Sequence, residues 1–264
     1  MLPLIPHRWP GPPLEARLLA RPNKFLAVCE LSGRTVEAHV PDRGRALDLL
    51  VPGQPIVLVA AQPATRGGPP RKTRFTLVLA RAKTPPSPWV CLDPAGAPRL
   101  VEAALERGLL PSLTGLRVVR REVAHGAHSR IDLLLGPRLG APSSSVAAGW
   151  DEDRLVLCEV KSVGAAREGL ALFPDAPTER GARHLAELSR LQRKRDKTGS
   201  GLSAAVVFVA QRGDARAVAP DREIDPAFAA ALARAHKAGV RLAALGCTAH
   251  PDGMELGTEL PLHL

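Results

Sequence analysis

The segment SAAVVFVAQ, residues 203–211, limits the fold of this chain more than any other feature of the sequence. It is an uninterrupted apolar run with the length of one strand, and such a strand lies in the middle of a sheet. Helix-like segments stand before and after it, at 178–195 and 225–239. The run therefore predicts an α/β domain built on a mixed sheet.

The rest of the second part of the chain continues this alternation. A helix is expected at 99–107, and Gly108 is suited to end it. Thr178 and Asp225 are suited to cap the two later helices at their N-termini. Strands are expected at the remaining apolar segments, which are 116–124, 131–135, 154–163 and 240–247. The order is helix, three strands, helix, strand, helix, strand.

The first part of the chain has a different pattern, in which short apolar segments are separated by turn signals such as Ser32-Gly33 and Pro52-Gly53. These segments are 14–31, 34–40, 54–61, 73–83 and 88–92. Five short strands predict a small barrel, and the oligonucleotide-binding (OB) barrel is one such form. A chain of 264 residues is long enough for two domains. We therefore expect an OB-like barrel at 1–93 and an α/β domain at 94–264.

The charge of the chain favours an anionic partner. Lys and Arg number 36 against 26 Asp and Glu, which gives a net charge of +10. Residues 1–93 carry 13 of the basic and only 6 of the acidic residues, so most of the surplus belongs to the barrel. Such asymmetry is typical of proteins that contact nucleic acid. A solvated, Arg-rich surface is the alternative, because net charge does not determine function.

The loop QPATRGGPPRKTR, residues 62–74, carries the densest group of positive charge in the barrel. We expect Arg71, Lys72 and Arg74 to contact DNA there. Aromatic residues are scarce in this part of the chain, which has only Trp9, Phe25, Phe75 and Trp89. Base stacking is therefore weakly supported, and phosphate contact is the expected use of the loop.

Neither a membrane location nor secretion is expected. No apolar run approaches the roughly 18 residues that a spanning helix needs. Prolines interrupt the N-terminal segment, which lacks the apolar region of a signal peptide. The four cysteines form no CxxC pair and have no zinc-site spacing, so we expect reduced, buried thiols in a cytoplasmic protein. The sequence leaves open whether the chain forms a homo-oligomer.

Three polar residues on two predicted strands form the candidate catalytic group. Asp132 lies in the strand SRIDLLL, and Glu159 and Lys161 lie in the next strand, CEVKS. Glu159 and Lys161 share a face because strands alternate, and pairing of the two strands would bring Asp132 beside Glu159. Two carboxylates are suited to hold Mg²⁺ or Mn²⁺, and the lysine can orient a water molecule or support charge on a phosphate. The pattern predicts metal-dependent hydrolysis of a phosphodiester bond.

This short pattern alone is weakly specific, since carboxylates and a lysine on strands also arise as a solvated sheet edge. The neighbours of these residues, such as Ile131, Leu133 and Val160, are apolar. This places the group in a buried sheet, where charge is costly unless it is paired or bound to metal.

Longer sequence motifs give a more specific indication of the fold and function than this short pattern. The runs HSRIDLLL, CEVKSV and above all LFPDAPTERGARHLAEL (172–188) resemble the sugar fermentation stimulation protein A (SfsA) family, and NKFLAVCEL and RKTRFTLVLAR follow it near the N-terminus. The resemblance implies an OB-like N-terminal domain, a C-terminal domain like the PD-(D/E)xK nucleases, and DNA binding. It matches Asp132, Glu159 and Lys161 to the nuclease triad and Glu122 to a further acidic position. The family's barrel arginine corresponds to Arg45, although the usual Asn-x-Gly before it is replaced here by Asp42-Arg43-Gly44.

Two further arginines are candidates for DNA contact. Arg130 shares a strand face with Asp132 and could contact the scissile phosphate, or it could form a salt bridge with Asp132 or Glu122. Arg180 lies in the first turn of the helix after Thr178, where a phosphate is favoured. His184, about one turn further on, is interpreted as a packed histidine rather than a catalytic one.

Two functions compete at this point. One is a DNA-binding protein with a nuclease domain that uses Mg²⁺ or Mn²⁺. The other is a non-cleaving, DNA-binding regulator of sugar (maltose) metabolism genes on a nuclease scaffold, because a fold does not determine an activity. A sugar-metabolising enzyme has no support, since the sequence contains no phosphate loop and no dinucleotide-binding motif.

Overall fold

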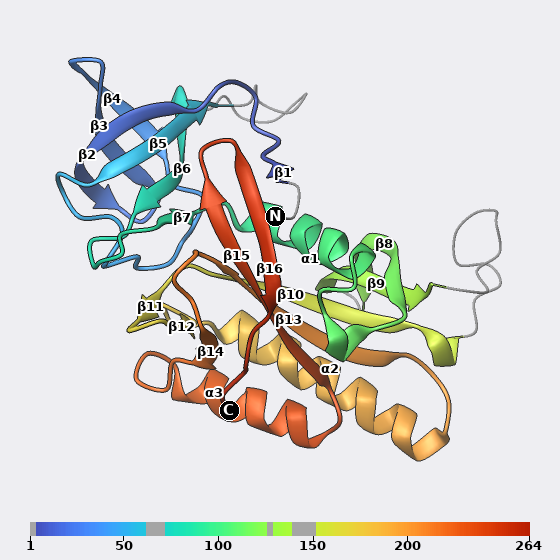
Figure 1. Ribbon diagram of the computed structural model, residues 1–264. Coiled ribbons are helices and arrows are strands. Elements are labelled where there is room, and N and C mark those ends of the chain that lie inside the picture. Colours follow the sequence, from blue (N-terminus) through green and yellow to red (C-terminus); the bar gives the residue numbers. More distant parts are fainter. Residues whose placement is uncertain (1–3, 62–71, 126–128, 139–151) are drawn as a thin grey trace.

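The computed structural model describes residues 4–61, 72–125, 129–138 and 152–264. Its first domain is a small barrel, coloured blue to cyan in Figure 1. The barrel strands are β2 (Leu14–Asn23), β3 (Leu26–Leu31), β4 (Arg34–His39), β5 (Pro55–Ala60) and β6 (Phe75–Arg81). Neighbours pair antiparallel in the order β4-β3-β2-β5-β6, and a parallel pairing of β4 with β6 closes the ring. A short strand, β7 (Trp89–Cys91), is added to β6. The predicted OB-like barrel is confirmed.

The second domain is built on a seven-stranded mixed sheet with the order β1-β16-β15-β13-β10-β9-β8. Its strands are β1 (Ile5–Pro6), β8 (Leu116–His125), β9 (Ser129–Pro137), β10 (Val156–Val163), β13 (Ser203–Gln211), β15 (Arg241–His250) and β16 (Gly253–Glu259). The apolar run at 203–211 is the central strand β13, with every residue buried. It pairs in parallel with β10 on one side and β15 on the other, as its composition predicts.

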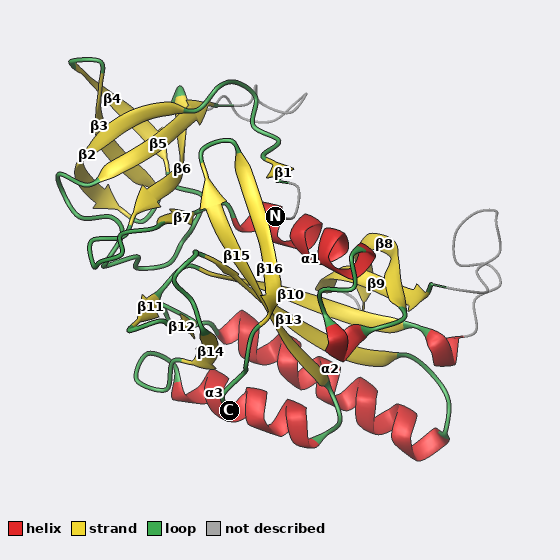
Figure 2. Ribbon diagram, in the orientation of Figure 1, coloured by secondary structure: helices red, strands yellow, loops and turns green. Residues whose placement is uncertain are grey.

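Helices cover both faces of this sheet (Figure 2). One face packs on α1 (Ala97–Glu106), and the other packs on α2 (Glu179–Thr198) and α3 (Pro226–Lys237). The predicted caps are confirmed: Thr178 Oγ1 accepts a hydrogen bond from Gly181 N (3.1 Å), and Asp225 Oδ1 accepts one from Phe228 N (2.8 Å). Short 3-10 turns are η1 (Pro94–Gly96), η2 (Pro111–Leu113) and η3 (Glu152–Arg154).

The two domains share an apolar core and polar contacts. Val57 and Leu79 of the barrel belong to the same buried cluster as Leu100 and Val207 of the second domain. Arg212, whose side chain is 3% exposed, lies 3.3 Å from Asp48 of the barrel and 2.6 Å from Asp214. These contacts hold the barrel against the second domain.

The loop between β4 and β5 also reaches across this joint. Ala46 N donates to the carboxylate of Asp175 at 3.1 Å. A Cβ atom at Gly44 would overlap the same carboxylate, so the close approach requires glycine there. A cavity of about 170 Å³ lies beside this contact, lined in part by Arg45 and Asp175. The barrel loop is thereby held against Asp175, four residues before α2 starts at Glu179.

The structure differs from the expected elements in several places. The segment 14–31 is not one strand but the hairpin of β2 and β3, with Lys24 and Phe25 between them. A three-stranded sheet was not expected; it consists of β11 (Ala166–Arg167), β12 (Leu170–Phe173) and β14 (Ala217–Pro220). β1 and β16 were not expected either, and their pairing joins the start of the chain to the second sheet. These elements are short or glycine-containing, so they carry little periodic pattern.

Candidate functional site

The candidate catalytic group forms where β9 and β10 separate. Their antiparallel register runs from Leu135 opposite Val156 to Leu133 opposite Cys158. Beyond that pair, Asp132 accepts the backbone N–H of Val160 through Oδ2 at 2.7 Å. The side chain thus satisfies a backbone donor that the neighbouring strand leaves unpaired. Asp132 and Glu159 are brought together here, as strand pairing predicts.

Glu159 is held by two donors on one of its oxygens. Its Oε1 lies 2.6 Å from Lys161 Nζ and 2.7 Å from His184 Nδ1. Lys161 reaches it because residues two apart share a strand face. The residue is only 4% exposed, and its second oxygen, Oε2, is buried with no hydrogen-bond partner within the described part of the chain. A buried carboxylate oxygen without a partner is costly, and a bound cation is one way to satisfy it.

The two carboxyl groups have pKa values displaced in opposite directions. Burial and then the nearby charge of Glu159 raise the pKa of Asp132 to about 6. Burial would also raise the pKa of Glu159, but the hydrogen bond from His184 and the charge of Lys161 outweigh it and lower that pKa. Glu159 is therefore kept ionised, and its negative charge disfavours ionisation of Asp132. Such opposed shifts in a buried pair are typical of functional sites.

His184 is the site residue that sequence reasoning missed. It is a buried residue of α2 and donates its Nδ1–H to Glu159, while its Nε2 lies 3.5 Å from Arg180 Nε, one turn earlier in the helix. The expectation of a packed histidine was incomplete, because the packing is against the carboxylate itself. The spacing of Arg180 and His184 after the Thr178 cap was the available signal, since it puts both on one helix face. Arg180 itself is exposed at the start of α2.

The side chains of Glu122 and Arg130 are exposed, unlike the carboxylate of Glu159. Their side chains are 77% and 73% exposed, and Arg130 Nη1 lies 3.5 Å from Glu122 Oε2. The alternative ion pair of Arg130 with Glu122 is therefore present, and contact of Arg130 with a phosphate stays a prediction. Among the described residues, no group of three or more His, Cys, Asp or Glu is placed to hold a metal ion. Asp132 and Glu159 would therefore act as a two-carboxylate pair.

The basic residues expected to contact DNA are spread over the barrel and its joint. Lys72 and Arg74 are exposed just before β6, while Arg71 lies outside the described residues. Arg45 is exposed beside the cavity at the joint. Their role in binding stays a prediction.

The donor set beside Asp132 fits a hard divalent cation. Carboxylate oxygens are the ligands that Mg²⁺ and Mn²⁺ prefer, and Mg²⁺ is usually held by one or two carboxylates while it keeps several waters. The unpartnered Oε2 of Glu159 is such an oxygen, and it lies in the group that contains Asp132. Cys158 is not placed to be a ligand there, because successive residues of a strand point to opposite faces and its side chain is buried in the apolar cluster on the α1 side of the sheet.

Within the described residues, no helix is long and apolar enough to cross a membrane. The four cysteines are free and buried, as the sequence predicts.

Comparisons with known proteins agree with this two-domain fold. The family model described as the SfsA N-terminal OB domain matches residues 19–92, and the one described as the sugar fermentation stimulation protein RE domain matches residues 96–253. Sugar fermentation stimulation protein homologs of Chloroflexus aurantiacus and Chloroflexus aggregans are 40% and 42% identical to this chain. Each alignment covers 98% of this chain, with 88% and 89% of the relatives.

A solved structure is similar over the whole length. Pyrococcus furiosus SfsA, in complex with Ca²⁺, has a TM-score of 0.77 and 25% sequence identity, covering 98% of this chain and 100% of the other. The domain matches, the identities and this fold lead to one conclusion. The chain belongs to the sugar fermentation stimulation protein family, SfsA.

Proposed function

We propose that this protein binds DNA and hydrolyses phosphodiester bonds in its second domain with Mg²⁺ or Mn²⁺. The observation that carries the proposal is how the two carboxylate oxygens of Glu159 are hydrogen-bonded. Its Oε1 is held by Lys161 and His184, and its Oε2 is buried without a partner in the described part of the chain, in a group with Asp132. This arrangement orients a carboxylate for a cation rather than for another side chain.

Each residue of the group has a defined task. Asp132 and Glu159 would ligate the cation, which when bound would polarise the phosphoryl oxygen and acidify a water molecule. Lys161, whose side chain is 14% exposed, can orient that water or stabilise charge on the phosphate. His184 is a positioning residue, because it touches Glu159 and fixes which oxygen faces the cation. Arg180, exposed beside His184, can hold a flanking phosphate.

Two further observations support the proposal. Pyrococcus furiosus SfsA was solved in complex with Ca²⁺, and Ca²⁺ takes oxygen ligands, as Mg²⁺ does. The barrel's charge surplus, 13 basic against 6 acidic residues in 1–93, favours a polyanion such as DNA.

The test is incubation of the protein with supercoiled plasmid and with circular single-stranded DNA, in the presence of Mg²⁺, Mn²⁺ or a chelator. We expect cleavage with metal and none with chelator. Glu159→Gln should abolish cleavage, while the matched control Glu223→Gln should leave it unchanged. Glu223 is a suitable control because it is 77% exposed and pairs only at 3.4 Å with Arg167, on another part of the surface.

A non-cleaving regulator on the same scaffold is the second candidate, and the names of the relatives favour it, since they describe stimulation of sugar fermentation. This function needs DNA binding without hydrolysis. The regulator would be favoured over the nuclease if DNA of both kinds stays intact with every metal and the protein still retains a specific DNA fragment. This holds whether or not calorimetry detects Mn²⁺ binding.

A further inference from the structure

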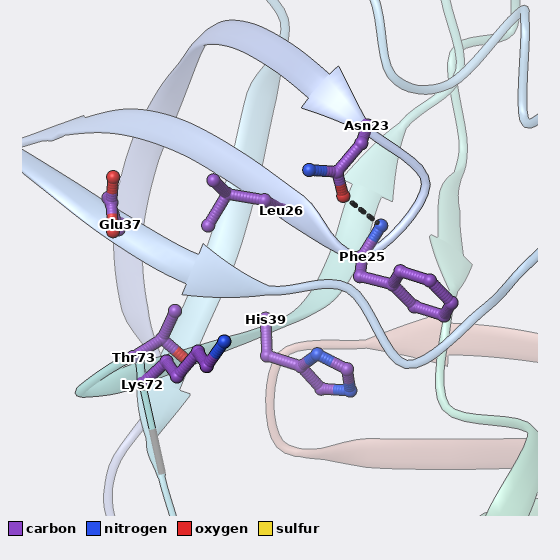
Figure 3. Close-up of a pocket in the computed structure, with 7 residues that line it drawn as sticks. All are labelled: Asn23, Phe25, Leu26, Glu37, His39, Lys72 and Thr73. Carbon is purple, nitrogen blue, oxygen red and sulfur yellow. Dashed lines mark hydrogen bonds between the residues drawn. The ribbon is translucent and has the colours of Figure 1, made fainter.

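A pocket of about 510 Å³ lies on the outer face of the barrel, separate from the carboxylate group (Figure 3). Its lining residues are Asn23, Phe25, Leu26, Glu37, His39, Lys72 and Thr73. Leu26 lies opposite His39 in the β3–β4 pairing, while their neighbours Ala27 and Ala38 are fully buried inside the barrel. Strand alternation therefore points Leu26 and His39 outward, and the volume is within the usual range for ligand sites.

Phe25 is the unusual residue of this pocket. It is 42% exposed and is the only aromatic among the exposed large apolar side chains of the described residues. It stands in the tight turn between β2 and β3, where its N–H donates to Asn23 Oδ1 at 2.9 Å. The turn thus presents an aromatic ring to solvent on an anchored backbone. Figure 3 shows the rings of Phe25 and His39 extending to the same side of the pocket.

Positive charge surrounds this ring. Lys24 Nζ lies over the Phe25 ring, 5.1 Å from its centre, and Arg43 Cζ lies over it at 5.7 Å. The exposed Lys72 lines the pocket from the segment before β6. Lys24 and Arg43 both have long, exposed side chains, so a flat base can replace either one on the ring while the displaced cation pairs with an adjoining phosphate. An apolar peptide or a neutral sugar lacks the negative charge that would pair with these cations.

The location agrees with the way that OB barrels bind. Their ligands lie on the outer face of the second and third strands, between the loop that joins the first two strands and the loop that joins the last two. In this barrel those elements are β3, β4, the turn with Lys24 and Phe25, and the segment with Lys72. The pocket occupies that position.

We infer that the pocket binds an unpaired base of single-stranded DNA, stacked on Phe25, with the adjoining phosphates beside Lys24, Arg43 and Lys72. The inference rests on the proposed function in one respect, namely that the barrel contacts DNA. It adds that the barrel selects single-stranded over duplex DNA, because bases inside a duplex are already stacked and cannot present a face to Phe25. Asn23 and Glu37 supply a donor and an acceptor for the edge of the base.

The experiment measures fluorescence anisotropy of one labelled oligonucleotide, single-stranded and annealed to its complement, at fixed salt. Wild type should bind the single strand more tightly. Phe25→Ala should weaken single-strand binding by roughly tenfold or more, with less than a twofold change for the duplex. Phe25→Trp should restore binding, and its added indole fluorescence should be quenched by the single strand. Leu47→Ala is the matched control, because Leu47 is 75% exposed on the barrel and outside the pocket.

The outcomes separate this inference from the proposed function. Single-strand binding that Phe25→Ala leaves unchanged overturns the pocket assignment and leaves DNA binding and cleavage standing. A wild type that binds neither form of DNA overturns the proposed function, and with it this inference. Tighter binding of the matching RNA, lost in Phe25→Ala, overturns DNA as the occupant.

Discussion

The carboxylate group on β9 and β10 and the pocket on the barrel are opposite kinds of site. In the first, Glu159 is 4% exposed and its contacts come from neighbours that lie on one strand and one helix. In the second, Phe25 is 42% exposed and the lining comes from the turn, two strands and a loop. A buried charged group must satisfy its own atoms, so its unpaired oxygen is informative. The side chains of an open surface pocket can be satisfied by water. The ligand of such a pocket must therefore be inferred from the charge and shape of its lining residues.

The largest effect should come from removing a ligand of the buried group. Asp132→Asn keeps the shape and the hydrogen bond to Val160 but removes the charge that a cation needs. We expect loss of Mn²⁺ binding in calorimetry and a fall in cleavage of roughly a thousandfold or more, since metal assistance supplies several kcal/mol. DNA binding should persist, because the proposed DNA contacts lie mainly on the barrel. Mn²⁺ uptake equal to that of wild type would show that Asp132 is not a ligand.

Removal of the positioning histidine should have a smaller and more specific effect. His184→Ala takes one hydrogen bond from Glu159 Oε1, and partners of a ligand typically contribute about 10- to 100-fold to affinity or activity. The hydrogen bond lowers the pKa of Glu159, so its loss raises that pKa and moves the acid limb of the pH–rate profile to higher pH. His184→Gln, which can still donate, should recover part of the loss.

If His184→Ala lowers the cleavage rate but leaves the acid limb of the pH–rate profile unchanged, then His184 supports only the packing of α2. In that case Leu188→Ala, a change of a fully buried residue on the same helix, should have the same effect as His184→Ala. The pair of variants therefore separates a contact with Glu159 from a general loosening of the helix.

The salt dependence of binding tests the barrel surface more widely. Replacing Arg71, Lys72 and Arg74 together by Ala should flatten the plot of log K against log salt by roughly one unit for each lost phosphate contact. Cleavage at saturating DNA should be unchanged, because these residues are far from the chemistry in sequence and belong to the other domain. The same slope in wild type and variant would exclude phosphate contact by this loop.

Much of this fold was accessible from the sequence, because long patterns determine it. The apolar run of β13 and the caps Thr178 and Asp225 predicted the central strand and the helices that cover it. Strand alternation also predicted that Glu159 and Lys161 share a face. β1 and β11 could not be found in this way, since two residues show no period. His184 and Phe25 were undervalued for a related reason: their roles depend on contacts or exposure that only the folded chain defines.

The smallest effect is expected at Glu122, which the family resemblance matches to an acidic catalytic position. The β8–β9 register pairs Arg121 with Leu133 and Val123 with Ile131, so Glu122 lies level with Asp132. Its side chain nevertheless is 77% exposed, at a φ of 52°, and is paired with Arg130. Charge at an exposed position is screened and contributes about 1 kcal/mol or less. Glu122→Gln should therefore reduce cleavage only a few-fold and leave Mn²⁺ uptake unchanged.

A loss of cleavage as large as that of Asp132→Asn would instead mean that β8 turns the Glu122 carboxylate inward when DNA and metal bind. The catalytic group would then be larger than the pair of Asp132 and Glu159.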